Sequence, residues 1–507
     1  MQRIKVLLFI PLALIWSNIV LAQTSEESHT NYCLQCEEIK NLRLPDVTIN
    51  QTELIQEPTP HCKVLGTIGS EIDFELLLPN DWNSRFIMGG GSGFAGSIIN
   101  LARPSINDGY ATSGTNTGHT SHVLKADWAL NNIERQLNFG HLAVHRTAVV
   151  SKEIIRQYYC SEIAYSYFWG CSRGGGQAMM EAQRYPEDFD GIVAGAPAFN
   201  WIAFGAKNIQ NSQVLFPNPE ELGESIITLA NIELLYSHIL EQCDQLDGLK
   251  DSILNDPRDC DFDFNQLPRC KIDVPSEDCF TSKQIEAIKV LYSTLSIDDN
   301  EIYPGSTFGC ENEEMGWQNW ITGPTTTPLA LDFPSLQFGF GTEIYKNLIF
   351  QDTDWDYSTY DFTDFSKTTQ YASSYLDATS LDYSDFKNQG SKLIIYHGWN
   401  DHGLSPLSTI DHYELVENFD ADIRDYFRLF LLPGILHCAG GPGPGQIDWV
   451  EIISNWVENN KVPERIVMSK LKNGNVVMTR PVFPYPEKAL YNGIGDPNLE
   501  SSFIKDE

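Results

Sequence analysis

A short serine motif constrains the fold of this 507-residue chain more than any other feature of its sequence. Ser172 is the central residue of a Gly-x-Ser-x-Gly pattern at residues 170–174. The pattern follows an apolar strand predicted over residues 163–169 and precedes a helix predicted over residues 177–184. Its glycines permit the strained strand-to-helix turn that lifts a serine hydroxyl above a sheet edge. A purely structural turn is the alternative, but this context favours a nucleophilic serine.

Four further apolar segments have the length of buried strands, and they run into glycines or polar residues. They lie at residues 85–88, 191–194, 392–396 and 427–432. Apolar strands that alternate with helical stretches are typical of a largely parallel sheet with helices on both faces. The sequence therefore predicts an α/β fold.

Residues 200–380 differ in character from the segments on either side. They contain aspartate-rich loops, closely spaced cysteines, and many aromatic residues among glycine, threonine and proline. A loop excursion of the sheet domain is the alternative, but about 180 residues far exceeds ordinary loop lengths. We therefore expect a second domain, inserted into a sheet domain formed by residues 23–199 and 381–507.

The first 22 residues have the organisation of a secretory signal peptide. Arg3 and Lys5 precede an uncharged apolar run, and residues 20–22 place small side chains at −3 and −1 of a cleavage site before Gln23. An uncleaved membrane anchor is the alternative, although polar residues interrupt the run. No later segment has the ~20 apolar residues that span a bilayer. We expect a secreted or periplasmic protein, soluble once residues 1–22 are removed.

The negative charge of the chain argues against nucleic acids and anionic membranes as partners. The chain has 34 Lys+Arg against 68 Asp+Glu, a formal net charge of −34. A surface this acidic repels phosphate backbones and anionic headgroups. We therefore expect no nucleic-acid partner, and no membrane partner after signal cleavage.

A nucleophilic serine needs a histidine base, and that histidine needs a carboxylate to fix its tautomer. In this fold class the chain order is serine, acid, histidine. His437 lies in a loop after the last predicted strand, and Asp401 occupies the equivalent place after the strand before it. We therefore predict that Asp401 and His437 complete a triad with Ser172. His397 and His402 are interpreted as hydrogen-bonded loop histidines.

Two cysteines connect the ends of this arrangement. Cys171 precedes Ser172, and Cys438 follows His437. If the serine and the histidine are within hydrogen-bond reach, their neighbours fall in the ~4.4 to 6.8 Å Cα range of a disulfide. The sequence therefore predicts the Cys171–Cys438 bridge, which would hold nucleophile and base in register.

The sequence resembles the tannase and feruloyl esterase family of α/β-hydrolases. The resemblance covers nearly the whole mature chain and rests on residues 82–83, 93–96, 170–172, 396–406, 437–438 and 480–496. It implies an α/β-hydrolase fold with a large lid domain at residues 200–380. It also implies that Ser172, Asp401 and His437 are the catalytic triad of a carboxylic ester hydrolase.

An acyl-transfer site also needs an oxyanion hole, which is a pair of donors aimed at the developing charge. One donor should be the backbone N–H of Arg173, directly after the nucleophile. The other should come from the glycine-rich loop at residues 89–93. The resemblance points to the stretch from Gly91 to Gly93 without fixing which residue donates.

Three aspartates in eight positions suggest a metal loop. Asp244, Asp247 and Asp251 supply the carboxylate oxygens that Ca²⁺ prefers, although their spacing is not that of an EF-hand. Simple solubility is the alternative reading of three aspartates in so acidic a chain. The resemblance implies a structural calcium ion in the lid, bound by these carboxylates and by the carbonyls of Leu249 and Ile253.

The 11 cysteines of an exported protein indicate disulfides first. The resemblance implies two bridges in the inserted domain, Cys243–Cys260 and Cys270–Cys279, and Cys36–Cys62 is a plausible N-terminal bridge. Three cysteines stay unassigned: Cys33, Cys160 and Cys310. The family's C-terminal bridge is missing, since Phe483 and a residue near Lys505 stand where its cysteines would be.

The expected function is that of a secreted serine esterase that cleaves a small aromatic ester or an esterified polysaccharide. A hydroxycinnamoyl (feruloyl) ester leads, a galloyl ester follows, and a terephthalate monoester ranks last. The family's terephthalate monoester hydrolase holds its substrate's carboxylate with a lid arginine, and no arginine occurs here between Arg269 and Arg424. Two alternatives stay open: a non-catalytic, calcium-stabilised sugar-binding or adhesion module, and a serine peptidase.

Overall fold

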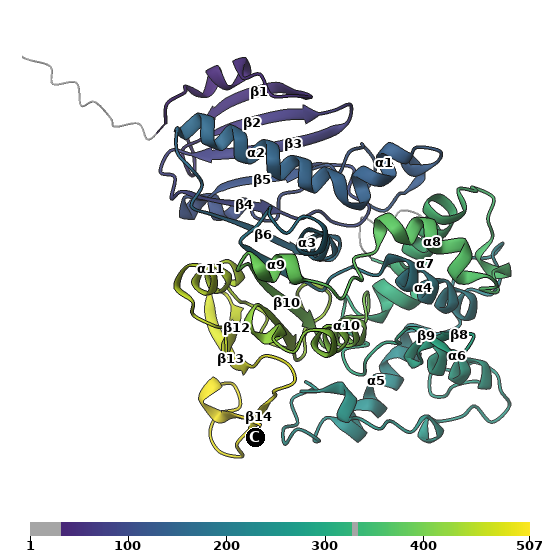
Figure 1. Cartoon of the computed structure of the whole chain (residues 1–507). Coiled ribbons are helices and arrows are strands. Elements are labelled where there is room, and N and C mark those ends of the chain that lie inside the picture. Colours follow the sequence, from purple (N-terminus) through teal and green to yellow (C-terminus); the bar gives the residue numbers. More distant parts are fainter. Residues whose placement is uncertain (1–31, 327–332, 507) are drawn as a thin grey trace, which may run out of the picture.

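A nine-stranded sheet organises the chain in the computed structural model, which describes residues 32–326 and 333–506 (Figure 1). In spatial order its strands are β1 (Val47–Ile55), β2 (His61–Ile68), β3 (Ile72–Pro79), β5 (Ala111–Thr115), β4 (Arg85–Gly89), β6 (Tyr165–Cys171), β7 (Gly191–Gly195), β10 (Lys392–Gly398) and β11 (Phe427–Leu432). The predicted signal segment at residues 1–22 lies outside the described residues. Among those described, no helix is both long enough and apolar enough to cross a bilayer.

The sheet has two parts that differ in strand direction. From β5 through β4, β6, β7 and β10 to β11, every neighbouring pair is parallel. β1, β2 and β3 form an antiparallel meander, which joins the parallel part through an antiparallel β3–β5 pair. Consecutive side chains of a strand point to opposite faces of the sheet, and in the parallel strands both sets are apolar, so both faces are buried. Phe86 and Met88 of β4 pack in one core cluster, whereas Ile87 between them packs in another.

Helices cover both faces of this sheet. One core cluster contains residues of α2 (Ala143–Tyr159), α3 (Arg173–Arg184) and α10 (Pro406–Phe419). The cluster on the opposite face contains residues of α11 (Trp449–Asn459). Two short helices, α1 (Ile133–Leu137) and α9 (Ser384–Asn388), lie in connections. The sheet is therefore the middle layer of a three-layer α/β architecture.

A long insertion separates two strands that are neighbours in the sheet. β7 pairs directly with β10, so the chain between them leaves the sheet and returns to it. This segment contains α4 (Trp201–Leu215), α5 (Leu229–Cys243), α6 (Ser282–Tyr292), β8 (Leu295–Ile297), β9 (Asn300–Tyr303), α7 (Leu336–Glu343) and α8 (Phe365–Leu376). Figure 1 shows it to the right of and below the parallel strands. Its core is shared with Phe94 and Phe139 of the sheet domain, which fixes the insertion against the sheet.

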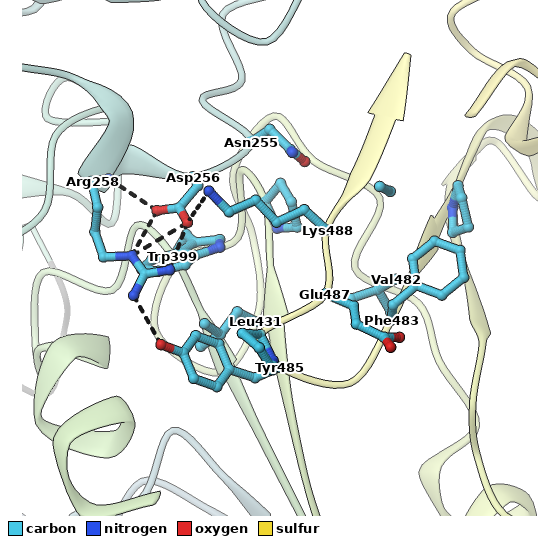
Figure 2. A pocket seen from close by; sticks show the side chains of 14 residues that line it. Asn255, Asp256, Arg258, Trp399, Leu431, Val482, Phe483, Tyr485, Glu487 and Lys488 are labelled. Carbon is cyan, nitrogen blue, oxygen red and sulfur yellow. Dashed lines mark hydrogen bonds and ion pairs between the residues drawn. The ribbon is translucent and has the colours of Figure 1, made fainter. Parts of the chain in front are cut away.

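The C-terminal segment forms two small hairpins, β12 (Ile466–Lys472) with β13 (Asn475–Val482) and β14 (Ala489–Tyr491) with β15 (Phe503–Lys505). Polar contacts connect it to the insertion, as Figure 2 shows. The Asp256 carboxylate lies 2.7 Å from Arg258 Nη2 and 2.8 Å from Lys488 Nζ, and Arg258 Nη1 donates to the Tyr485 hydroxyl at 3.1 Å. These contacts hold the C-terminal segment against the insertion.

The described residues contain five disulfides, two of which span more than 100 positions. They are Cys33–Cys160, Cys36–Cys62, Cys171–Cys438, Cys243–Cys260 and Cys270–Cys279. The pairing of Cys33 with Cys160 was not foreseen from the sequence, because the two are 127 positions apart and only tertiary packing brings them together. Cys310 is a buried free thiol.

Candidate active site

Ser172 lies at a sharp turn between β6 and α3. Its backbone has φ 62° and ψ −122°, a left-handed conformation that is uncommon for a non-glycine residue. Its carbonyl oxygen accepts from the N–H of Ala198 at 2.9 Å, and its N–H donates to Gly195 at 3.0 Å. A Cβ on Gly170 would stand 2.5 Å from the carbonyl carbon of Gly174, so this turn requires the motif's glycine.

Asp401 and His437 lie in loops at the carboxyl ends of β10 and β11, on the edge where β6 ends at Ser172. His437 Nδ1 is 2.7 Å from Asp401 Oδ2, a charge-assisted hydrogen bond in the usual base–acid arrangement. The Asp401 side chain has no exposed surface, whereas 11% of the His437 side chain is exposed. This pair can accept and hold a proton beside a nucleophile.

The Asp401 carboxylate accepts four hydrogen bonds. Oδ1 accepts from the N–H groups of Gly403 at 2.8 Å and Leu404 at 2.9 Å, and Oδ2 accepts from His437 and from His397 Nε2 at 3.1 Å. Burial alone would raise the pKa of Asp401. The charge of His437 and the hydrogen bonds from both histidines outweigh burial, so its pKa lies far below the usual range. Asp401 is therefore held ionised.

Two contacts place Ser172 and His437 at one site. The Cys171–Cys438 disulfide, with 5.9 Å between its Cα atoms, joins the residue before Ser172 to the residue after His437. The Trp320 ring meets the His437 ring edge-on, with 4.9 Å between centroids, and Trp320 also lines a pocket with Ser172. The structure thus brings the three predicted triad residues to one edge of the sheet.

The insertion braces the loop that carries Asp401. Asn400 Nδ2 donates to the carbonyl of Phe308 at 2.8 Å, and His402 Nε2 lies 3.0 Å from the carbonyl of Gly309. Both residues that flank Asp401 are thus bound to one segment of the insertion. The insertion therefore contributes to positioning the acid as well as covering the site.

The pocket beside Ser172 is small and largely aromatic. It is lined by Gly93, Ser172, Arg173, Ala198, Trp201, Phe204, Trp320, Phe340 and Leu404. Four of these side chains are aromatic, and all four belong to the insertion: Trp201 and Phe204 lie on α4, Trp320 lies in the segment before α7, and Phe340 lies on α7. Such a wall suits a flat apolar ring.

The candidate oxyanion donors differ in availability. The N–H of Arg173 belongs to the first residue of α3 and so has no partner in its own helix. The N–H of Gly91 donates to Gln177 Oε1 at 2.8 Å, so it is already engaged and is a poor second donor. Gly93 lines the pocket, and within the described chain no acceptor contacts its N–H. This geometry favours Gly93 over Gly91.

The Arg173 side chain is a buried cation that lies before the insertion in sequence. It is 1% exposed, and its Nη2 donates to the carbonyls of Phe139 and Gly140. Its guanidinium lies 4.2 Å from the Phe139 ring centroid and 5.3 Å from that of Trp201. Burial lowers its pKa to about 9. Arg173 thus forms part of the pocket wall.

The predicted calcium loop presents oxygen donors in a hydrogen-bonded turn. Asp244 Oδ1 accepts from the N–H of Ser252 at 2.7 Å, and Asp251 Oδ2 lies 2.7 Å from Arg480 Nη2. Burial, together with the nearby charge of Asp251, raises the pKa of Asp247 to about 6. Carboxylate oxygens are the donors that Ca²⁺ prefers, although Arg480 already balances the charge of Asp251. The N–H groups of Leu249 and Ile253 donate to Asp247 and Asp251, at 3.0 and 3.2 Å.

A different cluster, of one histidine and two acidic residues, brings its potential ligand atoms closer together than the aspartates of the loop. Among the described residues, the cluster whose ligand atoms all lie within 4.8 Å of one another is His145, Glu181 and Asp188, rather than the three aspartates of the loop. His145 Nδ1 is 2.6 Å from Asp188 Oδ2, and burial raises the pKa of Glu181 well above its usual value. The Lys152 ammonium donates to the carbonyl of Asp188, so the cluster already has a cation. We interpret it as a structural network.

Known proteins resemble this chain along most of its length. Residues 56–505 match the family model described as tannase and feruloyl esterase. The mono(2-hydroxyethyl) terephthalate hydrolase of Piscinibacter sakaiensis is 30% identical over 518 residues, covering 87% of this chain and 84% of that protein. A probable feruloyl esterase of Arthroderma benhamiae is 31% identical over 458 residues, covering 84% and 81%. Feruloyl esterase B from Aspergillus oryzae superposes with a TM-score of 0.83 at 25% identity, covering 93% of this chain and 99% of that one. The predicted α/β-hydrolase fold is confirmed.

Proposed function

Because the chain belongs to the tannase and feruloyl esterase family of carboxylic ester hydrolases, we propose that it cleaves esters of aromatic acids through a serine acyl-enzyme. The observation that carries this proposal is the 2.7 Å His437–Asp401 contact, joined to the turn of Ser172 by the Cys171–Cys438 disulfide. A non-catalytic sugar-binding or adhesion module needs none of this arrangement. The family match likewise gives a serine peptidase no support.

In the proposed mechanism, His437 accepts the proton of the Ser172 hydroxyl as the oxygen attacks the ester carbonyl. Asp401 fixes the tautomer of His437 and stabilises the imidazolium that forms. The N–H groups of Arg173 and Gly93 are the proposed donors to the oxyanion. His437 returns the proton to the leaving alcohol, and water, activated by the same histidine, then releases the acid.

The aromatic pocket supports an acyl group with a flat, uncharged ring. Trp201, Phe204, Trp320 and Phe340 can pack against a phenolic ring beside Ser172. A hydroxycinnamoyl ester, as in methyl ferulate, leads the proposal, and a galloyl ester follows. The alcohol could be small or part of a polysaccharide. No redox or organic cofactor takes part in the proposed reaction.

We expect kcat/KM for methyl ferulate to exceed that for a terephthalate monoester, because no arginine occurs between Arg269 and Arg424 to hold its carboxylate and the net charge of −34 repels anions. The two esters are compared at matched ionic strength, in a panel with methyl gallate, p-nitrophenyl acetate and a peptide. A higher value for the terephthalate monoester would contradict this pocket assignment and direct attention to Arg173. Cleavage of the peptide alone would contradict the esterase proposal.

Secretion and calcium binding are part of the same proposal. Five disulfides are typical of proteins that mature outside the cytoplasm, which supports export through the segment at residues 1–22. We propose that Asp244, Asp247 and Asp251 hold a structural Ca²⁺ with the carbonyls of Leu249 and Ile253. The ion would balance the charge of the loop and take no part in the chemistry.

A calcium chelator should lower the melting temperature of the protein and leave esterase activity intact while the insertion stays folded. The physical reason is that bound cation stabilises the folded state by mass action, whereas ester cleavage requires no metal. Adding Ca²⁺ back should restore the melting temperature of the parent but not that of Asp247→Asn. Immediate loss of activity without loss of stability would contradict a structural role.

A further inference from the structure

Two histidines, rather than one, donate to the proposed catalytic acid. Asp401 Oδ2 is 2.7 Å from His437 Nδ1 and 3.1 Å from His397 Nε2. His397 is the penultimate residue of β10 and is 1% exposed, so it is fixed by the sheet and shielded from water. The sequence suggested only a hydrogen-bonded loop histidine at this position.

The contacts of His397 assign its tautomer. Nε2 faces the Asp401 carboxylate and the carbonyl oxygen of Leu404, which is also 3.1 Å away. Both partners are acceptors, so Nε2 must carry a proton. Nδ1 lies 2.9 Å from the hydroxyl of Thr409 on α10, which can donate to it. His397 is therefore a fixed donor aimed at Asp401.

The remaining titratable groups around Asp401 do not duplicate this role. Burial lowers the pKa of His402 to about 4, although Asp401 acts in the opposite direction, and Nε2 of His402 is engaged with Gly309. Burial raises the pKa of Tyr303, so its hydroxyl stays neutral. Within the described residues, His397 and His437 are the side chains that hydrogen-bond to the carboxylate.

We propose that His397 is a positioning residue, which holds Asp401 ionised and correctly oriented for His437. This inference rests on the proposed serine mechanism. His437, and not His397, shares the disulfide link and the Trp320 contact with the Ser172 site. His397 therefore acts through Asp401 and not on the substrate.

His397→Ala should lower kcat roughly 10- to 100-fold with little change in KM, as expected when a charge-assisted hydrogen bond to the acid is lost. With one donor fewer, the Asp401 carboxylate presents more negative charge to His437. The acid limb of the kcat/KM profile should move upward accordingly. His397→Gln, whose Nε2 can replace the lost donor, should recover much of the rate.

A double-mutant comparison separates positioning from general stability. In an Asp401→Asn background, His397→Ala should cost little further activity, because its target carboxylate is gone. His412→Gln is the matched control, since His412 is also buried but its Nε2 contacts the Tyr383 hydroxyl. It should leave the pH profile unchanged.

Three results would overturn the inference. One is a His397→Ala enzyme with parental kcat and pH profile. Another is an equal loss from His397→Ala with and without the Asp401 carboxylate. The last is a His397→Gln enzyme that folds but is as impaired as Asp401→Asn, with an unmoved acid limb. If the parent hydrolyses no ester, or Ser172→Ala stays active, the proposed function fails independently of His397.

Discussion

Ser172→Ala should fold normally and lose roughly 10⁴- to 10⁶-fold in kcat on any ester that the parent cleaves. The change removes one oxygen atom from a turn that is held by backbone hydrogen bonds to Gly195 and Ala198, so stability should be preserved. His437→Ala should lose a similar factor, and Asp401→Ala roughly 10⁴-fold. Steady-state kinetics on methyl ferulate, with thermal melting as a fold check, measure these effects.

Because the three residues act as a unit, their effects should not add. Ser172→Ala combined with His437→Ala should be about as inactive as either single variant. His412→Gln serves again as a buried histidine change outside the site. An active Ser172→Ala enzyme would remove the nucleophile from the proposal, whatever the substrate.

The second large expected effect is a pH-dependent change in the free energy of unfolding, caused by Glu311, a glutamate buried within the insertion. Its Oε1 accepts from the Tyr292 hydroxyl at 2.7 Å and from the N–H of Gly309 at 2.6 Å, and Oε2 has no partner. Burial raises its pKa from 4.5 to about 7. The folded protein therefore keeps a proton on Glu311 over a range in which the unfolded chain has released it.

The direction in which the free energy of unfolding changes with pH follows from this difference in proton binding. Below pH 4.5 Glu311 is protonated in both states and costs nothing. As the pH rises from 4.5 to about 7, folding must take up a proton, so the parent loses stability, by an amount on the order of 3 kcal/mol in all. Glu311→Gln keeps Oε1 as the acceptor and cannot ionise. The stability of Glu311→Gln relative to the parent should therefore rise by that amount between pH 4.5 and pH 8.

Urea unfolding with the disulfides intact, at both pH values, measures this difference. Glu314→Gln is the matched control, because Glu314 is exposed in the same loop and its side chain stays in water in the folded state. A relative stability of Glu311→Gln that does not change with pH would show that the folded state does not hold Glu311 protonated.

Much of the site was predictable because its signals are local. The turn at Ser172 is specified by adjacent glycines, since a Cβ on Gly170 would stand 2.5 Å from the carbonyl carbon of Gly174. Asp401 and His437 were predicted from their places after apolar strands, since parallel strands end on one edge. The Cys171–Cys438 pair followed from being next to the predicted serine and histidine.

Other features depend on contacts between residues far apart in the chain, which periodicity and spacing do not encode. Gly91 is engaged by Gln177, 86 positions away, and Cys33 pairs with Cys160 across 127 positions. The antiparallel meander of β1 to β3 was likewise not foreseen. Its outer strand β1 is a half-buried edge strand, which gives a weaker apolar signal than a central strand.

The sequence by itself therefore determined the α/β class and predicted an inserted segment and a candidate triad, because the signal for each lies in short contiguous stretches. Only the tertiary structure decided which groups surround that triad. The contact of His397 with Asp401, the buried cation of Arg173 and the unpartnered oxygen of Glu311 arise where distant elements exclude water together. Burial and hydrogen bonding of this kind are properties of the packed chain, because the dielectric and the partners around a side chain exist only after folding.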